Sequence, residues 1–423
     1  MKVLVIGNGG REHALCWKLA KSVEVNELYV ISGNDGMRDV ATVVPVMSQD
    51  DILDFARLMQ IDLTVAGPET VLADGLADRF AEAGLPFFGP SRAAAQIEGS
   101  KSFAKDLMKK YGIPTASYDV FTEEEQAVSY ARAQSYPLVI KADGLAAGKG
   151  VVIAETAEEA EAAIRDMMEG HAFGSAGASV VIEEFMEGEE ASVLAFCDGK
   201  TIIPMVSSQD HKRIGDHDEG PNTGGMGAYA SAPVMTDALM DTVQKTILQP
   251  VCDAMRAEGH PFVGCLYAGL MITADGPKVV EFNCRFGDPE TEVVLPLLAS
   301  DLYVIMKHCV EGNLSEADVS WKEGYAVDVV LASEGYPRSH SDGDVITGLG
   351  EARQTGCHLF HAGTKKVKGE FVTAGGRVLN VVALAPTLPE AIEKAYRGVS
   401  CIRFRGMQYR RDIGAKGLAH LKK

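Results

Sequence analysis

Short apolar runs alternate with amphipathic stretches over the first 90 residues of the chain. Residues 2–7 form an apolar run that ends in glycine, and residues 11–21 carry apolar side chains at helical spacing. The same succession continues with expected strands at 27–31, 62–66 and 86–88 and expected helices at 50–60 and 71–83. Because strands alternate with helices, the pattern predicts a parallel, doubly wound α/β sheet.

The pattern beyond residue 90 predicts three further units. A lysine-rich helix is expected over 91–111, where Gly112-Ile113-Pro114 ends it. The remaining expected elements are strands at 138–141, 151–154 and 180–184 with a helix at 157–169, a larger mixed unit from about 191 to 313, and strands at 325–331, 358–362 and 377–385 with a helix at 388–399. We therefore expect four domains, at residues 1–100, 101–190, 191–324 and 325–423.

Composition and charge limit the possible functions. With 423 residues, the chain is too long for one hydrophobic core. Its net charge of −19 argues against a nucleic-acid partner, because phosphate backbones bind to basic surfaces. No run approaches the roughly 18 apolar residues that a membrane span needs, and the first residues do not resemble a signal peptide. The eight cysteines form no CxxC pair, so we expect a cytoplasmic protein without a zinc site or a disulfide framework.

A glycine-rich loop, Gly7-Asn8-Gly9-Gly10-Arg11-Glu12, follows the first expected strand. It departs from the dinucleotide-binding pattern because Glu12 occupies the third glycine position, which disfavours an NAD-dependent oxidoreductase. Backbone N–H groups at a helix N-terminus suit an anion, and Arg11 adds positive charge. We expect Gly9, Gly10 and Arg11 to contact a phosphate-bearing substrate. The alternative is a structural strand-to-helix turn.

A second glycine-rich loop, the lysine–glycine loop, lies within residues 139–152. We expect a strand that carries Lys141, followed by a turn of small residues that carries Lys149. The small side chains allow the backbone to close over a triphosphate, and Lys141 is placed to neutralise phosphate oxygens. No Gly-Lys-Ser/Thr leads into a helix, so this is not a Walker loop. The stretch predicts a nucleotide site, with a flexible hairpin that carries surface lysines as the alternative.

Acidic residues lie on both sides of Phe185-Met186 within residues 181–192, directly after an apolar run. This arrangement suits an adenine hinge, in which backbone groups of Glu184 and Met186 meet the base and a carboxylate binds the ribose hydroxyls. Without the preceding lysine–glycine loop, the same pattern is typical of a solvated acidic turn.

Glu281, Asn283 and Arg285 alternate with apolar residues over 279–290, so we expect them on one face of a strand. A carboxylate and an amide oxygen side by side are hard ligands that suit Mg²⁺, which keeps its other positions for water and ATP phosphates. A neighbouring arginine would repel the metal unless it faced an anion, and we expect a substrate carboxylate or an acyl phosphate in that place. The alternative is a cross-strand salt bridge.

Several stretches together resemble the ATP-grasp superfamily and, within it, the phosphoribosylamine–glycine ligase family, and the resemblance covers essentially the whole chain. These stretches are GNGGREHAL at 7–15, GPE at 67–69, SKSFAKDLMKKYGIPTA at 100–116, IKADGLAAGKGV at 140–151, EEFMEGEEAS at 183–192, SQDHKRIGDHDEGPNTGGMGAY at 208–229 and EFNCRFGDPE at 281–290. The last two are the most specific. The resemblance implies an α/β ATP-grasp fold, with an N-terminal doubly wound parallel sheet domain, a small mobile α/β lid and a C-terminal α+β domain.

The resemblance also implies a role for individual residues of these motifs. For ATP it implies Lys105, Lys141, Gly148, Lys149, Gly150, Glu183, Glu184, Met186 and the ribose ligand Glu190, with Lys101 as a competitor of Lys105. It implies Mg²⁺ or Mn²⁺ at Glu281 and Asn283, and catalytic roles for Lys141 and Arg285. For the other substrates it implies Gly9, Gly10, Arg11, Asp210, Lys212, Asn222, Gly224, Gly225, Arg285 and Asp288.

The implied reaction joins glycine to 5-phosphoribosylamine. The carboxylate of glycine attacks the γ-phosphate of ATP, the small domain closes over glycyl phosphate, and the amine then attacks to give glycinamide ribonucleotide, ADP and phosphate. His211 is expected to contact a phosphate, and Cys265 and Cys284 are expected in the core. The alternatives are a biotin carboxylase-like or aminoimidazole ribonucleotide carboxylase-like enzyme and a non-catalytic nucleotide sensor. We expect a monomer or weak dimer, and the C-terminal unit carries no chemistry that residue types reveal.

Overall fold

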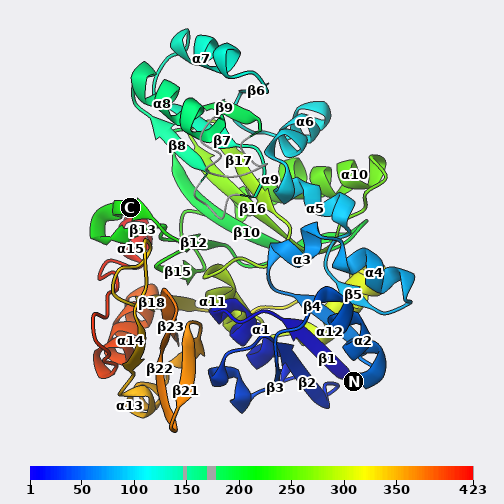
Figure 1. The fold of residues 1–423 in the computed structure, drawn as a ribbon, viewed down its shortest axis with the longest axis vertical. Coiled ribbons are helices and arrows are strands. Elements are labelled where there is room, and N and C mark those ends of the chain that lie inside the picture. Colours follow the sequence, from blue (N-terminus) through cyan, green and yellow to red (C-terminus); the bar gives the residue numbers. More distant parts are fainter. Residues whose placement is uncertain (146–149, 169–177, 423) are drawn as a thin grey trace.

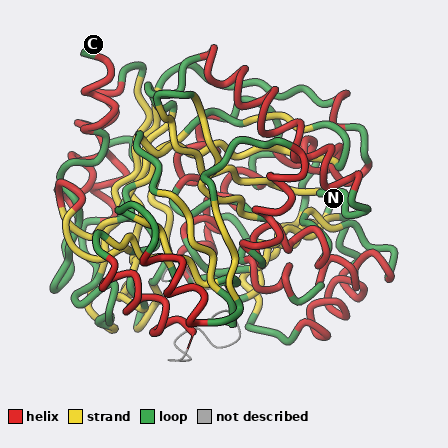
Figure 2. The backbone as a smooth tube through the Cα atoms, turned by 90° about the horizontal axis from the view of Figure 1, so that it is seen from above, coloured by secondary structure: helices red, strands yellow, loops and turns green. Residues whose placement is uncertain are grey.

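The structure, a computed structural model, describes residues 1–145, 150–168 and 178–422. The strands of this part of the chain form sheets of five, nine, two, three and four strands. Figure 2 shows that many strands run through the interior while most helices lie outside them. In Figure 1 the four-stranded sheet with α7 (Glu124–Arg132) and α8 (Ala157–Met168) lies at the top, and the N-terminal and C-terminal segments lie below it, side by side.

The N-terminal segment folds as the parallel sheet that the sequence predicts, in the order β3-β2-β1-β4-β5. Its strands are β1 (Lys2–Ile6), β2 (Glu27–Ile31), β3 (Thr42–Val44), β4 (Leu63–Ala66) and β5 (Phe87–Phe88), and its helices are α1 (Gly10–Leu19), α2 (Gln49–Met59), α3 (Glu69–Ala73), α4 (Leu76–Glu82) and α5 (Arg92–Gly99). The central strand β1 is almost continuously apolar, because a parallel strand covered by helices is buried on both faces.

Two expected helices are each divided. The helix expected over 91–111 is interrupted at Ser100, whose extended backbone (φ −135°, ψ 112°) ends α5 and whose hydroxyl accepts the N–H of Phe103 to begin α6 (Lys101–Tyr111). The helix expected over 71–83 is interrupted at Gly75, whose φ of +90° is left-handed. Apolar periodicity continues across both breaks, so the pattern alone concealed them.

The small unit is an antiparallel sheet in the order β6-β9-β7-β8, covered by α7 and α8. Its strands are β6 (Tyr118–Phe121), β7 (Leu138–Ala142), β8 (Val151–Ala154) and β9 (Val180–Glu184). The strand β6 and the helix α7 were not expected from the sequence. Ile140, Ile164 and Ile182 belong to a hydrophobic cluster formed only by residues of this unit.

A nine-stranded sheet links the middle and C-terminal segments, in the order β17-β16-β10-β12-β15-β18-β23-β20, with β11 on β10. Its strands are β10 (Glu189–Asp198), β11 (Ile202–Pro204), β12 (Ser208–Asp210), β15 (Gly227–Ala230), β16 (Val263–Thr273), β17 (Gly276–Asn283), β18 (Tyr325–Ala332), β20 (His358–His361) and β23 (Arg377–Ala385). The expected boundary at residue 324 lies directly before β18, and the sheet continues across it through the pairing of β15 with β18.

Shorter elements surround this sheet. They are the hairpin β13 (Arg213–Gly215) and β14 (Glu219–Asn222), the helices α9 (Asp237–Val243), α10 (Gln249–Ala257), α11 (Glu290–Val294), α12 (Leu302–Glu311), α13 (Leu349–Gln354), α14 (Leu388–Cys401) and α15 (Ala415–Leu421), and the sheet of β19 (Asp342–Val345), β22 (Glu370–Ala374) and β21 (Thr364–Val367). None of the helices within residues 1–145, 150–168 and 178–422 is long and apolar enough to cross a membrane.

The N-terminal and C-terminal segments are joined by buried polar contacts. The side-chain amide of Asn34, which follows β2, donates to the carbonyls of Asn8 and His361 at 2.9 and 2.8 Å. The backbone N–H of His361 donates to Nδ1 of His13 at 2.8 Å. These contacts hold the first glycine-rich loop against β20. The N-terminal and C-terminal segments therefore border the same region.

Candidate active site

Two lysines from different segments meet at one buried carboxylate. Lys141 on β7 donates to Glu183 on β9 at 3.0 Å, and Lys105 on α6 lies 3.2 Å from the same carboxylate. All three side chains are at most 6% exposed. Burial lowers the pKa of Lys105 to about 8, although Glu183 opposes that shift. Glu183 therefore serves as the counter-ion of both expected phosphate-binding lysines.

Lys101 and Lys105, which the sequence left as competitors, have different contacts. Lys105 also donates to the hydroxyl of Thr115 at 2.7 Å, whereas Lys101 donates to the carbonyl of Gly144 in the lysine–glycine loop at 2.7 Å. Gly150 is buried, and its carbonyl accepts the N–H of Ala142. Gly148 and Lys149 lie outside the described residues.

The expected adenine hinge is partly occupied by protein contacts. The N–H of Glu184 donates to the carbonyl of Ser117 at 3.0 Å, and the N–H of Ser117 donates to the Glu184 carboxylate at 3.0 Å. The N–H of Glu184 is therefore not free to contact a base. The expectation that the backbone of Glu184 meets the adenine is wrong for this donor. Met186 is half-buried, and a cleft of about 420 Å³ lies beside Glu183, Glu184 and Phe185.

Glu281 and Asn283 occupy alternate positions at the end of β17, opposite Gly269 and Tyr267 of β16. Alternate residues of a strand share a face, so the two side chains can act together. Burial raises the pKa of Glu281, but the nearby lysines Lys212, Lys141 and Lys101 lower it by more. The pKa of Glu281 therefore lies below its ordinary value. An ionised carboxylate beside an amide oxygen fits Mg²⁺ or Mn²⁺.

No group of three or more His, Cys, Asp and Glu side chains is arranged to hold a metal within residues 1–145, 150–168 and 178–422. Two protein ligands are sufficient for Mg²⁺, because this ion retains several waters and binds substrate phosphates. Glu281 and Asn283 thus remain compatible with the expected metal. They would not form a site for an ion that needs a complete protein cage.

Arg285 lies beyond the end of β17, so the expectation that it shares a strand face with Glu281 and Asn283 is wrong. It lies 3.2 Å from Glu69 and 3.3 Å from Glu98, two protein carboxylates that the sequence did not connect to it. Burial lowers the pKa of Arg285, but these carboxylates more than reverse the effect and keep it charged. The structure therefore supplies anionic partners for Arg285 without a substrate.

The expected ribose ligand Glu190 lies 2.8 Å from Lys212, which is half-exposed. Burial raises the pKa of Asp210 to about 7, with Lys212 opposing the shift and Glu290 and Glu190 adding to it. Lys212 thus lies near Glu190, which the sequence assigned to ATP, and near Asp210, which it assigned to the other substrates. Asn222 is exposed at the end of β14.

His211, expected as a phosphate contact, is instead a neutral core residue. It is 2% exposed, and Nδ1 lies 3.3 Å from the carbonyl of Gly227. Burial lowers its pKa to about 4, and nearby Arg410 contributes to that shift. A neutral, enclosed imidazole offers no charge to a phosphate. Cys265 and Cys284 are buried, as the sequence predicts.

The first glycine-rich loop is closed partly by its own glutamate. The carboxylate of Glu12 accepts the N–H of Gly9 at 2.7 Å and the Nε–H of Arg11 at 2.6 Å. Arg11 also donates to the carbonyl of Phe286 at 3.1 Å. The expected free charge of Arg11 is therefore neutralised by Glu12, and Gly10 lies directly against Glu292 and Asn380.

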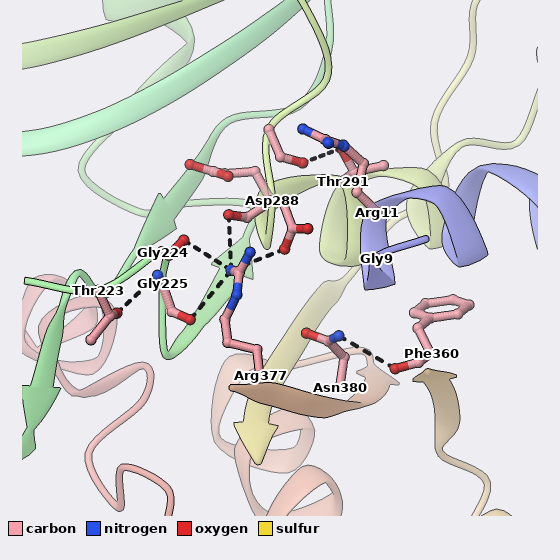
Figure 3. A network of polar contacts seen from close by, with 12 residues as sticks. Gly9, Arg11, Thr223, Gly224, Gly225, Asp288, Thr291, Phe360, Arg377 and Asn380 are labelled. Atoms are coloured by element: carbon pink, nitrogen blue, oxygen red, sulfur yellow. Dashed lines mark hydrogen bonds and ion pairs between the residues drawn. The ribbon is translucent and has the colours of Figure 1, made fainter. Parts of the chain in front are cut away.

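A cleft of about 430 Å³ lies between the N-terminal and C-terminal segments, with Asn8, Gly9, Asp288, Lys365 and Arg377 in its lining. Figure 3 shows Arg377 at the centre of a polar network there. Its Nη1 lies 3.0 Å from the carboxylate of Asp288 and 2.9 Å from the carbonyl of Gly224. Gly225 also contributes its carbonyl, at 3.5 Å.

Two further carboxyl groups lie behind Asp288. Glu292 on α11 and Asp328 on β18 are fully buried, and the Glu292 carboxyl lies close enough to Asp288 to share a hydrogen bond with it. Burial raises the pKa of each well above its ordinary value, and Asp288 adds to the shift while Arg377 opposes it. Both groups therefore hold their protons to higher pH than ordinary carboxyl groups do.

Comparison with known proteins decides the family. Models of the phosphoribosylglycinamide synthetase N domain, ATP-grasp (A) domain and C domain match residues 1–98, 99–291 and 326–416. The chain belongs to the phosphoribosylglycinamide synthetase family. This confirms the resemblance found in the sequence, including the ATP-grasp fold.

Relatives of this family match over nearly the full chain. The phosphoribosylamine–glycine ligase of Halalkalibacterium halodurans is 53% identical over 421 residues, covering 99% of this chain and 98% of that protein. The crystal structure of the phosphoribosylamine–glycine ligase from Thermotoga maritima has a TM-score of 0.85 at 35% identity, covering 98% of this chain and all of that one. A biotin carboxylase from Campylobacter jejuni, with a TM-score of 0.73 over 100% of this chain and 94% of that one, is only 14% identical and shows a shared fold alone.

Some residues that build the site of this family member were missed by sequence reasoning. Glu98 and Lys365 are common surface residue types, and nothing in their spacing marks them. Arg377 carries one signal, the Gly375-Gly376 pair directly before it, because glycines at a strand often mark a close backbone approach. Both Gly375 and Arg377 line the cleft, so the C domain forms part of its wall.

Replacing Asp328 tests the buried protons. Because the folded-state pKa of Asp328 is raised, wild-type stability should fall as pH rises from about 4 toward that pKa, and Asp328→Asn lacks this loss. The Tm of Asp328→Asn relative to wild type should therefore increase as pH rises above about 4. Asp275→Asn, at an exposed turn, is the control. A relative Tm that is lower and independent of pH would contradict the assignment.

Proposed function

We propose that this chain ligates glycine to 5-phosphoribosylamine through glycyl phosphate, giving glycinamide ribonucleotide, ADP and phosphate in purine (IMP) biosynthesis. One observation carries most weight. Lys141, paired with Glu183, also donates to the carbonyl of Val280 at 3.3 Å, next to Glu281. A phosphate-binding lysine and the candidate metal ligand therefore meet at one point, where transfer of a γ-phosphate needs both.

At the nucleotide end, Lys105 and Lys141 are proposed to bind ATP phosphates. Bound phosphates replace part of the charge that Glu183 now supplies, so the lysines are held ready before ATP arrives. The carbonyl side of Glu184, with Met186, is proposed to meet the adenine, and Glu190 the ribose. Gly148, Lys149 and Gly150, which lie between β7 and β8 in the sequence, are proposed to cover the phosphates.

Glu281 and Asn283 are proposed to hold Mg²⁺ or Mn²⁺. An ion held there would neutralise negative charge that builds up during phosphoryl transfer. The ionised state of Glu281 keeps that position acidic, and Lys141 and Lys101 balance it. Arg285 is proposed to bind and orient the glycine carboxylate. Its ion pairs with Glu69 and Glu98 fix the direction of the guanidinium.

The other substrate is proposed to enter the cleft between the N and C domains. Asn8 and Gly9 lie in its lining, and Lys365 adds a positive charge suited to a sugar phosphate. Asp288 lies in the same lining, so the amine can reach the region of Arg285 from this side. Gly10, Arg11, Asp210, Lys212, Asn222, Gly224 and Gly225 are proposed to shape this half of the site.

Glycyl phosphate must be kept from water until the amine attacks. The small unit has a hydrophobic cluster of its own, so it can move as one body while its interior packing remains intact. We propose that it closes over the nucleotide end as a lid. The cytoplasmic location and the monomeric or weakly dimeric state expected from the sequence stay predictions.

An activity assay tests the proposal. Purified protein with MgATP should release ADP only when glycine and freshly prepared phosphoribosylamine are both present. Glu281→Ala should lower kcat/KM by at least about 100-fold through loss of a metal ligand, while the exposed control Asp275→Ala keeps wild-type activity. ADP release without the amine, release with bicarbonate in place of glycine, or normal turnover by Glu281→Ala would count against the proposal.

Glu183→Gln tests whether the lysine pair binds polyphosphate. Without the carboxylate, two buried cations lose their partner, which costs about 3–5 kcal/mol and lowers Tm. Bound ATP restores negative charge, so MgATP should raise the Tm of Glu183→Gln by more than it raises that of wild type. Glu158→Gln, exposed on α8, should behave as wild type. An equal or smaller ATP-induced shift in Glu183→Gln would show that the lysines do not face the phosphates.

A further inference from the structure

Arg377 is the first residue of β23 in the C domain. Its side chain reaches two separate loops at the cleft between the N and C domains, the turn at Gly224 and the loop that carries Asp288. Its side chain is 22% exposed and that of Asp288 is 15% exposed. Besides the Asp288 carboxylate, its Nη1 lies 3.2 Å from the Asp288 carbonyl and 2.9 Å from the Gly224 carbonyl. Figure 3 shows these contacts converging on the guanidinium from two separate segments.

Each of these segments contains or contacts a predicted site residue. Thr223, next to Gly224, donates its N–H and its hydroxyl to the carbonyl of Lys212 at 2.7 and 2.9 Å. Asp288 follows Arg285 by three residues in the loop after β17. A shift of Arg377 would therefore displace the loop of Lys212 and the loop of Arg285 together.

A second group from the C-terminal segment anchors the same turn. The hydroxyl of Tyr336 accepts the N–H of Gly224 at 2.9 Å. The ring of Tyr336 packs directly on Gly376, where there is no space for a Cβ. Tyr336 and Arg377 thus hold Gly224 from both sides, Tyr336 through the N–H of this residue and Arg377 through its carbonyl.

Electrostatics also favour Arg377 as a fixed group. Asp288, Glu292 and Asp328 gather around it, and Arg377 opposes the rise in pKa of both buried carboxyls. Burial lowers the pKa of Arg377, but Asp288 and its other neighbours reverse the shift, so it remains charged. A charged guanidinium enclosed by carboxylates and carbonyls has few alternative orientations.

We propose that Arg377 is a positioning residue for the amine substrate, and that with Tyr336 it makes the C domain part of the ligation machinery. It acts through the Gly224 turn and Asp288 and does not act on ATP. This inference rests on the proposed function, since it needs a phosphoribosylamine site in the cleft. The role is one of geometry at these two loops, so loss of Arg377 should affect the use of phosphoribosylamine much more than the use of ATP.

Steady-state kinetics with each substrate varied in turn tests this role. Arg377→Met should lower kcat/KM for phosphoribosylamine by about 10- to 100-fold, the usual effect of losing charge-assisted hydrogen bonds, with KM for ATP within about two-fold of wild type. Arg377→Lys keeps a donor and a charge and should recover part of the loss. Arg397→Met, an exposed arginine on α14 that pairs only with Glu393 among the described contacts, is the matched control.

A double-mutant cycle separates positioning from direct contact with substrate. Tyr336→Phe removes one hydroxyl and should lower the same kcat/KM by about 3- to 10-fold. Because both residues act through Gly224, the fold-loss in kcat/KM for the double variant Arg377→Met with Tyr336→Phe should be smaller than the product of the two single losses. Independent effects, equal loss in KM for ATP, or normal use of phosphoribosylamine by Arg377→Met would overturn the inference. Wild type without amine-dependent ADP release would instead refute the proposed function.

Discussion

The carboxylate of Glu183 lies between Lys105 and Lys141, and the nucleotide end of the site depends on this interaction. Lys105 on α6 and Lys141 on β7 lie more than thirty positions apart in the sequence, and neither could remain charged and buried without a counter-ion. Their positions are fixed before any phosphate binds. That preorganisation is what allows a site to stabilise developing charge without first rearranging itself.

The same principle recurs along the site with other partners. Arg285 is held by Glu69 and Glu98, so the N domain fixes a residue of the ATP-grasp domain. Arg377 is held by Asp288, so the C domain contacts the adjacent loop. Each domain thus supplies at least one charge that another domain neutralises. This explains how a chain with a net charge of −19 can present several cations at one place.

The sequence predicted most of what local chemistry determines. The apolar run of β1 and the helices after it predicted the parallel sheet, because burial on both faces leaves few alternatives. Glu281 and Asn283 were recognised because hard ligands at alternate strand positions are unusual in an otherwise apolar stretch. The break at Ser100 was missed, since a capping serine inside a continuous amphipathic pattern differs little from a surface serine.

Partners distant in sequence could not be predicted. Nothing about Glu69 or Glu98 indicates that Arg285 lies beside them, and nothing about His211 shows that burial makes it neutral. Arg377 became recognisable only when the pairing of β18 with β23 brought it to Asp288 and Gly224. These contacts are set by how the domains pack, and residue spacing does not contain that information.

The central claim is that the carboxylate of glycine is phosphorylated before the carbon–nitrogen bond forms. Glycine labelled with ¹⁸O in its carboxylate tests this directly. Its oxygen attacks the γ-phosphorus and ADP leaves; the amine then attacks the carbonyl carbon and phosphate leaves with that oxygen. Mass spectrometry of the products should find one ¹⁸O atom in inorganic phosphate for each glycinamide ribonucleotide formed. Unlabelled phosphate accompanying normal product formation would contradict the account.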